Sequence, residues 1–283
     1  MSYSNGYDDT ITTMAMSHSS ELYKPSLTTL IFDVDDTMYD VGTGFTAHRN
    51  GYGATSFMVE KLGFESLEKA QVIRDKYFEI YHSTAKALTV MEREGVIPPG
   101  APKFETEDLA DWWATQLNFT LLNSQSEEYK HLRQILEICP LRLVAFSNGP
   151  RKYVLRVLKE LNLSELFPPQ HVFAVDDVLP ACKPEPEAFE KVFETLGIKD
   201  PRECVMIEDS MKNIRVAKML GLKTILVTGK SDHDNPSHKH AAEATKTGDV
   251  PLADDPAVDV VIEHCGQLKL SCPGLWNIPP TFP

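Results

Sequence analysis

Three carboxylates follow a short apolar segment near the start of the chain. Residues 27–34 are rich in apolar and β-branched side chains, which is typical of a strand buried on both faces of a parallel sheet. Asp33, Asp35 and Asp36 stand at its end, and strand alternation places Asp33 and Asp35 on one side with Asp36 opposite. A single aspartate in this position is most often a turn former. That interpretation is less favoured for three acids directly after an apolar strand, and carboxylates are side chains that can act as nucleophiles or proton carriers.

A second polar group follows the apolar segment 141–146, where the chain reads Ser147-Asn148-Gly149. Asn-Gly is also a strong signal for a β-hairpin, so that alternative has to be weighed. Residues 151–161, however, keep their apolar side chains on one helical face directly after a proline. This pattern favours a strand-to-helix junction, which presents Ser147 and backbone N–H groups to an anion.

Lys183 and an acidic pair occupy the next two segment ends. Taken alone, a lysine in front of a helical segment is usually a solvated surface charge. Glu208 and Asp209 end another apolar segment, with Asn213 a few residues further on. Helix capping by Asp209 or Ser210 is one interpretation of these residues. The other is that the acids supply hard oxygen ligands to a divalent cation facing the carboxylates of the first strand.

The order of these groups along the chain carries more information than any one of them. In open α/β sheets, ligands bind beyond the carboxyl ends of the strands. Carboxylates, a hydroxyl, a lysine and a second acid pair at successive strand ends are therefore expected to converge on one crevice. Together they match the needs of phosphoryl transfer from a small ester: a nucleophile, a proton donor, phosphate ligands and a magnesium site.

The elements that position these groups alternate between strands and helices after residue 138, which predicts βαβ units and a parallel sheet. The expected strands are 27–34, 141–146, 172–175, 204–207, 224–227 and 257–262, and the expected helices between them are 151–161, 184–196 and 211–220. The first two strands are separated by more than a hundred residues, too many for a structureless loop. Helical patterns fill this gap at 46–62, 67–94, 107–117 and 126–138.

We therefore predict an α/β fold with a doubly wound, Rossmann-like parallel sheet and an inserted α-helical cap domain. The expected parts are a flexible N-terminal tail (1–26), a core (27–40 plus 139–276, with a polar loop at 230–256), the helical cap (41–138) and a C-terminal coil (277–283).

The composition limits the classes of partner. The 283 residues include 28 basic and 41 acidic side chains, a formal net charge of −13, which argues against a nucleic acid polymer as partner. No apolar run is long enough to span a membrane, and no secretory signal is evident, so we expect a cytoplasmic or nuclear protein. The five scattered cysteines favour neither disulfides nor structural zinc. The expected partner is a small phosphorylated substrate, and the oligomeric state stays open.

These residues resemble the four motifs of the haloacid dehalogenase-like phosphohydrolase superfamily. Asp33-x-Asp35-x-Thr37 is similar to the first motif, Ser147 to the second, Lys183 to the third, and Glu208-Asp209-x-x-x-Asn213 to the fourth. The helical insertion after the first motif is similar to the family's first-type cap. Within the superfamily, the chain looks most like eukaryotic pyrimidine 5′-nucleotidase-like enzymes, on FDVDDTMYDVGTG (32–44), VEKLG (59–63), FSNGPRKYVLRVLKELNL (146–163), CKPEPEAFEK (182–191), EDSMKNIRVAKMLGLKTILV (208–227) and the C-terminal VDVVI…LW (258–276).

The resemblance implies a Mg²⁺-dependent phosphatase. Asp33 is then the nucleophile that becomes an aspartyl-phosphate, and Asp35 is the acid and base. It further implies three residue sets: Mg²⁺ ligands Asp33, Asp35 (backbone carbonyl) and Asp209; phosphate ligands Ser147, Asn148 and Lys183; and supporting residues Glu208, Asn213 and Thr37. Tyr39, His48, Arg49 and Asn50 are candidates for contact with the leaving group from the cap.

Several functions remain open at this point. The leading hypothesis is hydrolysis of a pyrimidine nucleoside 5′-monophosphate. A sugar phosphate, phosphoglycolate, pyridoxal phosphate or flavin mononucleotide is the alternative substrate, and a phosphomutase would use the same aspartyl-phosphate. A non-catalytic binding protein is a further alternative, which the presence of Asp33, Asp35, Lys183 and Asp209 disfavours.

Overall fold

The computed structural model describes residues 27–123, 125–229 and 252–277, so the expected tail, most of the 230–256 loop and nearly all of the C-terminal coil lie outside the described residues. The centre of the fold is a six-stranded sheet in the order β3-β2-β1-β4-β5-β6, and all neighbouring strands are parallel. Its strands are β1 (Thr29–Phe32), β2 (Arg142–Phe146), β3 (Val172–Phe173), β4 (Cys204–Glu208), β5 (Lys223–Val227) and β6 (Val260–Ile262).

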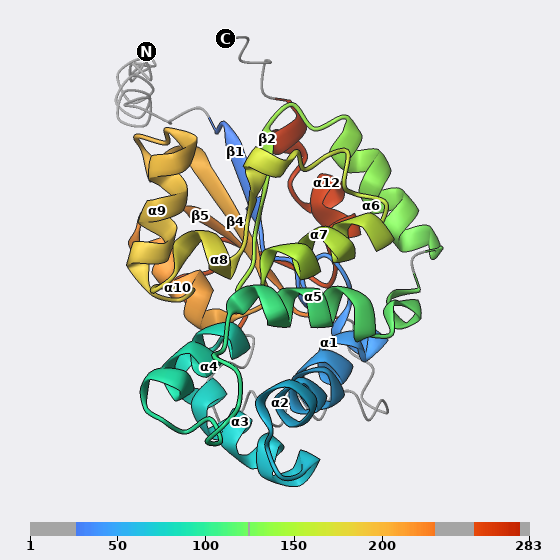
Figure 1. The fold of residues 1–283 in the computed structure, drawn as a ribbon. Coiled ribbons are helices and arrows are strands. Elements are labelled where there is room, and N and C mark those ends of the chain that lie inside the picture. Colours follow the sequence, from blue (N-terminus) through green and yellow to red (C-terminus); the bar gives the residue numbers. More distant parts are fainter. Residues whose placement is uncertain (1–26, 124, 230–251, 278–283) are drawn as a thin grey trace, which may run out of the picture.

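Helices cover both faces of the sheet, as strand alternation demands (Figure 1). On one face, Ile31 packs with side chains of α9 (Pro186–Leu196) and α10 (Met211–Met219). On the other, Leu30 and Phe32 pack with α7 (Arg151–Glu160), α6 (Glu127–Glu137) and α12 (Leu268–Ser271). The predicted doubly wound α/β fold is confirmed.

The insertion between β1 and β2 is helical. Its elements are η1 (Val41–Thr43), α1 (Phe45–His48), the π-helical turn η2 (Arg49–Gly53), α2 (Ala54–Leu62), α3 (Leu67–Tyr81), α4 (Thr84–Arg93), α5 (Thr106–Gln116), η3 (Phe119–Leu122) and α6. The expected cap range 41–138 includes α6, but this helix packs against the sheet with the core. In Figure 1, α2, α3 and α4 lie beyond the carboxyl ends of the strands, and α5 crosses between them and the core. This places the cap over the edge of the sheet where the polar residues were expected.

The expected continuous helix over 67–94 is wrong. It is interrupted at His82, which adopts left-handed backbone torsions (φ 53), and at Ser83, whose side chain caps the start of α4. A serine favours a helix start over a helix interior because its hydroxyl can accept from a backbone N–H two or three residues ahead. The amphipathic pattern continues through this break, so periodicity alone did not show it.

Three strands are shorter than expected. The strand expected over 27–34 forms only at Thr29–Phe32. Residues 172–175 supply a strand only at Val172–Phe173, because Val175 starts the short helix α8 (Val175–Val178). The expected strand 257–262 forms only at Val260–Ile262. Asp259 instead accepts a hydrogen bond from the Thr224 N–H at 3.0 Å, which ties the approach to β6 to the start of β5. The β-branched composition identified these segments as strands but did not show where the strands begin and end.

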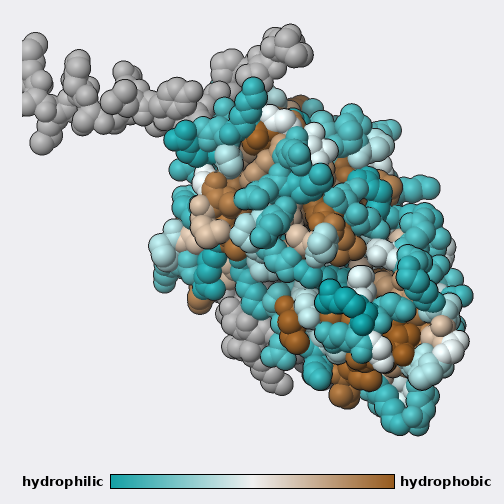
Figure 2. Space-filling model, turned by 60° about the vertical axis from the view of Figure 1, so that its left-hand side comes forward, coloured by the Kyte–Doolittle hydropathy of each residue, from teal (hydrophilic) through white to brown (hydrophobic). Residues whose placement is uncertain are grey.

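The molecular surface is mostly hydrophilic on the face shown in Figure 2, with separate apolar patches between the charged groups. Among the described residues, no helix combines the length and the apolar character needed to cross a membrane.

Candidate active site

A cavity of about 170 Å³ lies between the carboxyl ends of the strands and the cap. Because β1, β2 and β4 are adjacent and parallel, the residues that follow them meet at this edge. The cap closes the cavity with side chains from α1, η2, α3 and the turn after α3. It is lined by Asp33, Asp35, Thr46, Arg49, Asn50, Phe78, His82, Asn148, Lys183, Pro184, Glu208, Asp209, Ser210, Lys212 and Asn213.

Lys183 bridges two carboxylates in the interior. Its Nζ lies 2.6 Å from Asp33 Oδ1 and 2.8 Å from Glu208 Oε2, and the lysine is 1% exposed. The two negative charges raise the pKa of Lys183 although burial opposes this, so the ammonium group stays charged. Burial and the charge of Glu208 raise the pKa of Asp33 to about 8 despite the neighbouring lysine.

Asp209 completes an acidic cluster with Asp33 and Glu208, whose oxygen atoms lie within 4.8 Å of one another. The hydroxyl of Thr37 donates to Asp209 Oδ1 at 3.2 Å and lies 3.4 Å from Asp33 Oδ2. Burial and the charges of its acidic neighbours raise the pKa of Asp209 well above its usual value. Ser210 precedes α10, yet its side chain makes no capping hydrogen bond to that helix.

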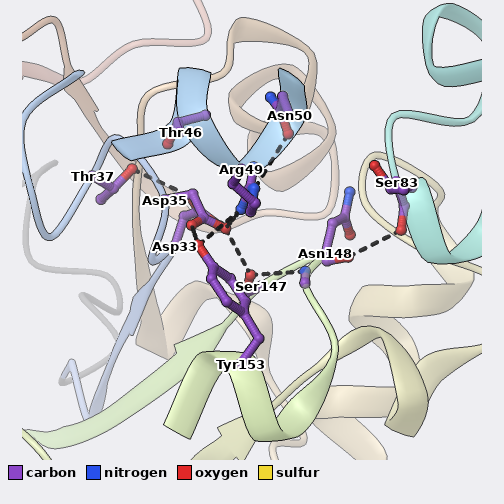
Figure 3. Close-up of polar contacts among 12 residues, drawn as sticks. Asp33, Asp35, Thr37, Thr46, Arg49, Asn50, Ser83, Ser147, Asn148 and Tyr153 are labelled. Atoms are coloured by element: carbon purple, nitrogen blue, oxygen red, sulfur yellow. Dashed lines mark hydrogen bonds and ion pairs between the residues drawn. The ribbon is translucent and has the colours of Figure 1, made fainter. Parts of the chain in front are cut away.

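Asp35 is held by four donors, three of which, Arg49, Ser147 and Tyr153, are labelled in Figure 3. Tyr39 donates to Oδ1 at 2.5 Å, Tyr153 donates to the same oxygen, Arg49 forms an ion pair with Oδ2, and Ser147 Oγ donates to Oδ2 at 3.3 Å. Burial alone would raise the pKa of Asp35. The Arg49 charge and the two phenolic hydrogen bonds outweigh burial, so the pKa is lowered and Asp35 is a carboxylate.

Arg49 reaches Asp35 from the cap. Its guanidinium carbon lies 5.4 Å from the ring centroids of both Trp113 and Tyr153, and Nη1 donates to the Tyr153 hydroxyl at 3.1 Å. The residue begins the π-helical turn η2, which ends at Gly53, where a side chain would collide with Leu117. Single π turns inside helices often serve functional sites because they redirect a side chain. Here the turn directs Arg49 toward the core.

The side chain of Asn148 is fully engaged with two loops. Its Oδ1 accepts from the Lys183 N–H at 2.9 Å, and its Nδ2 donates to the Lys183 carbonyl at 2.7 Å and to the His82 carbonyl at 3.2 Å. Ser83 Oγ in turn donates to the Asn148 carbonyl at 3.0 Å. The side chain therefore has no group left for a phosphate, and only the backbone N–H of Asn148 could take that role.

A comparison with the profiles of known protein families shows which family the chain belongs to. The family profile of haloacid dehalogenase-like hydrolases matches residues 27–221. The chain belongs to this family. The family resemblance expected from the sequence is confirmed, and the matched range contains all four motifs.

Curated relatives of this haloacid dehalogenase-like hydrolase match only parts of it. A CBBY-like protein of Arabidopsis thaliana is 38% identical over 63 residues, 21% of this chain and 19% of that protein. Phosphoglycolate phosphatase 1 of Pseudomonas aeruginosa is 27% identical over 101 residues, 36% of each chain. The chain thus spans about a fifth and about a third of these relatives' lengths. Among solved structures, the HAD phosphatase from Thermococcus onnurineus has the same fold, with a TM-score of 0.52 and 19% identity over 86% of this chain and 97% of that chain.

The acidic cluster of this haloacid dehalogenase-like hydrolase suits a hard divalent cation. Carboxylate oxygens are the ligands that Mg²⁺ prefers. Glu208 has both oxygens occupied, since Oε2 accepts from Lys183 and Oε1 accepts from the Ser210 N–H at 3.2 Å. Asp33 Oδ2 and Asp209 Oδ1 both contact the hydroxyl of Thr37, at 3.4 and 3.2 Å, and these contacts are weak. A buried and a half-buried carboxylate with too little positive charge between them fit a bound cation.

The structure brings together all core residues that the sequence singled out: Asp33, Asp35, Thr37, Ser147, Asn148, Lys183, Glu208, Asp209 and Asn213. The cap candidates divide. Arg49 and Asn50 line the cavity. Tyr39 is 1% exposed and bonds Asp35 from behind, while His48 accepts from the Asn118 N–H outside the cavity. Asp36 lines a different, small cavity on the far side of this loop, as strand alternation predicted.

Sequence reasoning missed Tyr153, His82, Ser83 and Lys212. Tyr153 belongs to the apolar face of α7, where an aromatic residue indicates core packing, so only its hydroxyl gives it a role in the site. His82 and Ser83 were placed inside one long helix, which hid the turn that they form. Lys212 had no signal beyond its place near the fourth motif.

Proposed function

We propose that this chain is a Mg²⁺-dependent phosphatase that hydrolyses a small phosphate monoester through an aspartyl-phosphate. The observation that carries the proposal is the convergence of Asp33, Lys183 and Asp209, with the hydrogen-bonded carboxylate of Asp35 and Ser147 at the same cavity. These groups supply a nucleophile, a phosphate ligand, a cation site and a proton carrier at one cavity.

Asp33 attacks the phosphorus atom in line, and the bond from phosphorus to the ester oxygen breaks. The leaving oxygen takes a proton from Asp35, which has to be protonated before this step, with Arg49 withdrawn from its carboxyl group. Water then attacks the aspartyl-phosphate and gives a proton to Asp35, and the bond between phosphorus and the Asp33 carboxylate oxygen breaks, which restores both side chains. Ser147 Oγ, the Asn148 N–H and Lys183 Nζ hold the phosphoryl oxygens.

Asp33 and Asp209 would hold Mg²⁺ with the backbone carbonyl of Asp35, and Glu208 would position Lys183. When bound, the cation neutralises charge on the transferring group and on the acids around it. Without it, four carboxylates line the cavity (Asp33, Asp35, Glu208 and Asp209) against the charges of Arg49, Lys183 and Lys212.

Two leaving groups are candidates. The sequence resemblance to pyrimidine 5′-nucleotidase-like enzymes favours a pyrimidine nucleoside 5′-monophosphate. The partial similarity to a protein named Phosphoglycolate phosphatase 1 favours a small phosphorylated hydroxy acid. In both cases the cap excludes water from the phosphoryl group and contacts the rest of the substrate.

The test is phosphate release from p-nitrophenyl phosphate with and without Mg²⁺, for the wild type and for Asp33→Asn. We expect turnover that needs Mg²⁺ and falls by at least about a thousandfold in the variant, because the nucleophile is lost. Glu190→Gln, on the exposed side of α9, is the control and keeps full activity. Metal-dependent turnover retained by Asp33→Asn would sink the proposal.

A further inference from the structure

The wall of the cavity that the cap and α10 provide differs in charge from its floor. The four acids of the lining, Asp33, Asp35, Glu208 and Asp209, follow β1 and β4. The cap and the start of α10 contribute Arg49, Asn50, Phe78, His82 and Lys212 instead. Among the described residues of the lining, this side therefore carries cations, amides and an aromatic ring but no carboxylate.

His82 is fixed in position by its backbone and its neighbours. It adopts left-handed torsions at the end of α3, and its carbonyl accepts from Asn148 Nδ2 at 3.2 Å. The next residue, Ser83, bonds back to the Asn148 carbonyl. The ring of Phe78 meets the His82 ring edge to face, with centroids 6.5 Å apart. The imidazole is thus held at the cavity by the same loop that would bind the phosphoryl group.

Lys212 meets this imidazole across the boundary between cap and core. Its Nζ lies 3.3 Å from His82 Nε2. An ammonium group has only N–H donors, so the ring nitrogen that it contacts has to accept, and the neutral imidazole carries its proton on Nδ1. The pair therefore brings one full positive charge and N–H donors from two different elements to this wall. That combination matches the two oxygens of a carboxylate.

The size of the cavity limits what can accompany the phosphoryl group. At about 170 Å³ it is smaller than the roughly 300–1,000 Å³ of pockets that hold drug-sized ligands. It also has to contain the phosphoryl group itself. A leaving group of two or three carbons fits within this space, whereas a nucleoside would extend beyond it.

We propose that His82 and Lys212 form a recognition site for a carboxylate on the leaving group, so that the substrates are phosphate esters of short hydroxy acids. This inference rests on the proposed phosphatase function and specifies its substrate class. The residues on the floor of the cavity contact the phosphoryl group, which all phosphate monoesters share, so they do not distinguish one ester from another. The wall formed by His82 and Lys212 distinguishes them by the charge carried beyond the ester oxygen.

The first experiment varies only that charge. Phosphate release by the wild type with Mg²⁺ is measured on 2-phosphoglycolate, 2-hydroxyethyl phosphate and phosphoethanolamine, with cytidine and uridine 5′-monophosphate for comparison. We expect kcat/KM for 2-phosphoglycolate to exceed that for the neutral ester by about tenfold or more, with the cationic ester lowest. A nucleotide or the neutral ester as the best substrate overturns the inference.

The second experiment removes the proposed cation. Lys212→Met keeps the chain length and should lower kcat/KM on 2-phosphoglycolate by about tenfold more than it lowers kcat/KM on the neutral ester. His82→Asn, which tolerates left-handed torsions, should reduce the same preference. Lys218→Met is the matched control on α10, because Lys218 is ion-paired with Asp259 at 2.5 Å and does not line the cavity.

The outcomes separate the two proposals. If the aryl ester is hydrolysed but Lys212→Met leaves the preference intact or lowers all esters equally, the carboxylate site is wrong and the phosphatase stands. If the wild type releases phosphate from no ester, the proposed function fails and this inference fails with it.

Discussion

The guanidinium of Arg49, in the cap, is ion-paired with the carboxylate of Asp35, in the core. The exposed fractions of the two side chains are 10% and 13%, so solvent screens the pair little. The position of the cap therefore affects the charge of Asp35, the proposed acid and base. As long as the pair is intact, Asp35 is suited to accept a proton from water, and its donation to a leaving group requires Arg49 to withdraw.

We predict that Arg49→Met shifts the acidic limb of the pH–rate profile. The lowered pKa of Asp35 depends on the Arg49 charge, so the variant should need a higher pH to ionise Asp35. The acidic limb of kcat should therefore move to higher pH, measured with p-nitrophenyl phosphate and Mg²⁺. An unmoved limb would show that Asp35 does not control it. Arg215→Met, which breaks only an exposed ion pair with Asp255, is the control.

The same substitution should cost stability in a pH-dependent way. Leaving a buried charge without its partner costs about 3–5 kcal/mol. A depressed pKa stabilises the fold above the unfolded value, near 3.8, and this stabilisation is lost as the pH falls through the folded value. The difference in unfolding free energy between wild type and Arg49→Met should thus be largest near neutral pH and shrink below about pH 4. A constant difference in urea titrations would contradict this.

We predict that Mg²⁺ stabilises the protein more at alkaline than at acidic pH. Asp33 has a pKa raised to about 8, so it weakens the fold progressively as the pH rises from about 4 to 8 and the buried carboxylate ionises. Metal binding requires the ionised form and releases the proton. At one fixed Mg²⁺ concentration, chosen a hundredfold above the Kd at pH 8.5, Tm should rise by about 5 °C or more near pH 8.5. The same concentration should raise Tm by less near pH 6, where Mg²⁺ binds more weakly.

The matched variant for this experiment is Asp209→Asn. It removes a proposed ligand and one negative charge from the cluster. The variant should therefore be more stable than the wild type without Mg²⁺, because its like-charge repulsion is lower. It should gain little when Mg²⁺ is added. A Tm increase equal to that of the wild type would place the metal elsewhere.

The sequence predicts the core of this fold well because its signals are local. Apolar runs such as 141–146 and 204–207 fall on central strands buried on both faces, and the residue after each run is fixed at the carboxyl edge by topology alone. Asp33, Ser147 and Asp209 therefore converge as expected. Lys183 also reaches the cavity, but it follows α8 and a loop rather than the end of a strand. The ends of β3 and β6 were less predictable, since they depend on contacts with distant residues such as Thr224.

The cap side of the site could not be predicted in the same way. Tyr153 and Asp35 are separated by 118 positions, and nothing in the apolar pattern of α7 indicates that a hydroxyl reaches a carboxylate. His82 enters the cavity only because the helix breaks there, while the amphipathic pattern runs through the break. Lys212 and His82 meet only after the insertion folds back over the sheet.

We predict that Tyr153→Phe lowers activity beyond its effect on stability. The substitution removes a hydrogen bond to Asp35, which costs about 1–2 kcal/mol of folding free energy and frees the carboxylate to reorient. We expect kcat to fall by about tenfold with little change in KM. Tyr77→Phe is the control, because the hydroxyl of Tyr77 donates to a carboxylate, Glu94 Oε2, at 2.6 Å and Tyr77 does not line the cavity. Equal losses of kcat in both variants would show that Tyr153 affects activity only through packing.

We predict that Asn148 couples the cap turn to the phosphate site. Asn148→Ala removes three hydrogen bonds, two to the Lys183 backbone and one to the His82 carbonyl, at a cost of about 3 kcal/mol. Because the loop that carries Lys183 is then released, inhibition by inorganic phosphate should weaken by about tenfold or more. Asn148→Asp keeps only the acceptor and adds a negative charge, so it should be worse than alanine for phosphate binding.

Stability and function can be separated here with Ser126→Ala. Ser126 caps α6 through the Tyr129 N–H, far from the cavity, and its loss should cost about 1 kcal/mol without changing the inhibition constant for phosphate. If phosphate inhibits Asn148→Ala as strongly as the wild type while Tm falls, the side chain only stabilises the loops. If inhibition weakens in Asn148→Ala and Asn148→Asp alone, the two loops and the cap turn act as one unit, because a single side chain then holds Lys183 and His82 at the positions from which they face the substrate.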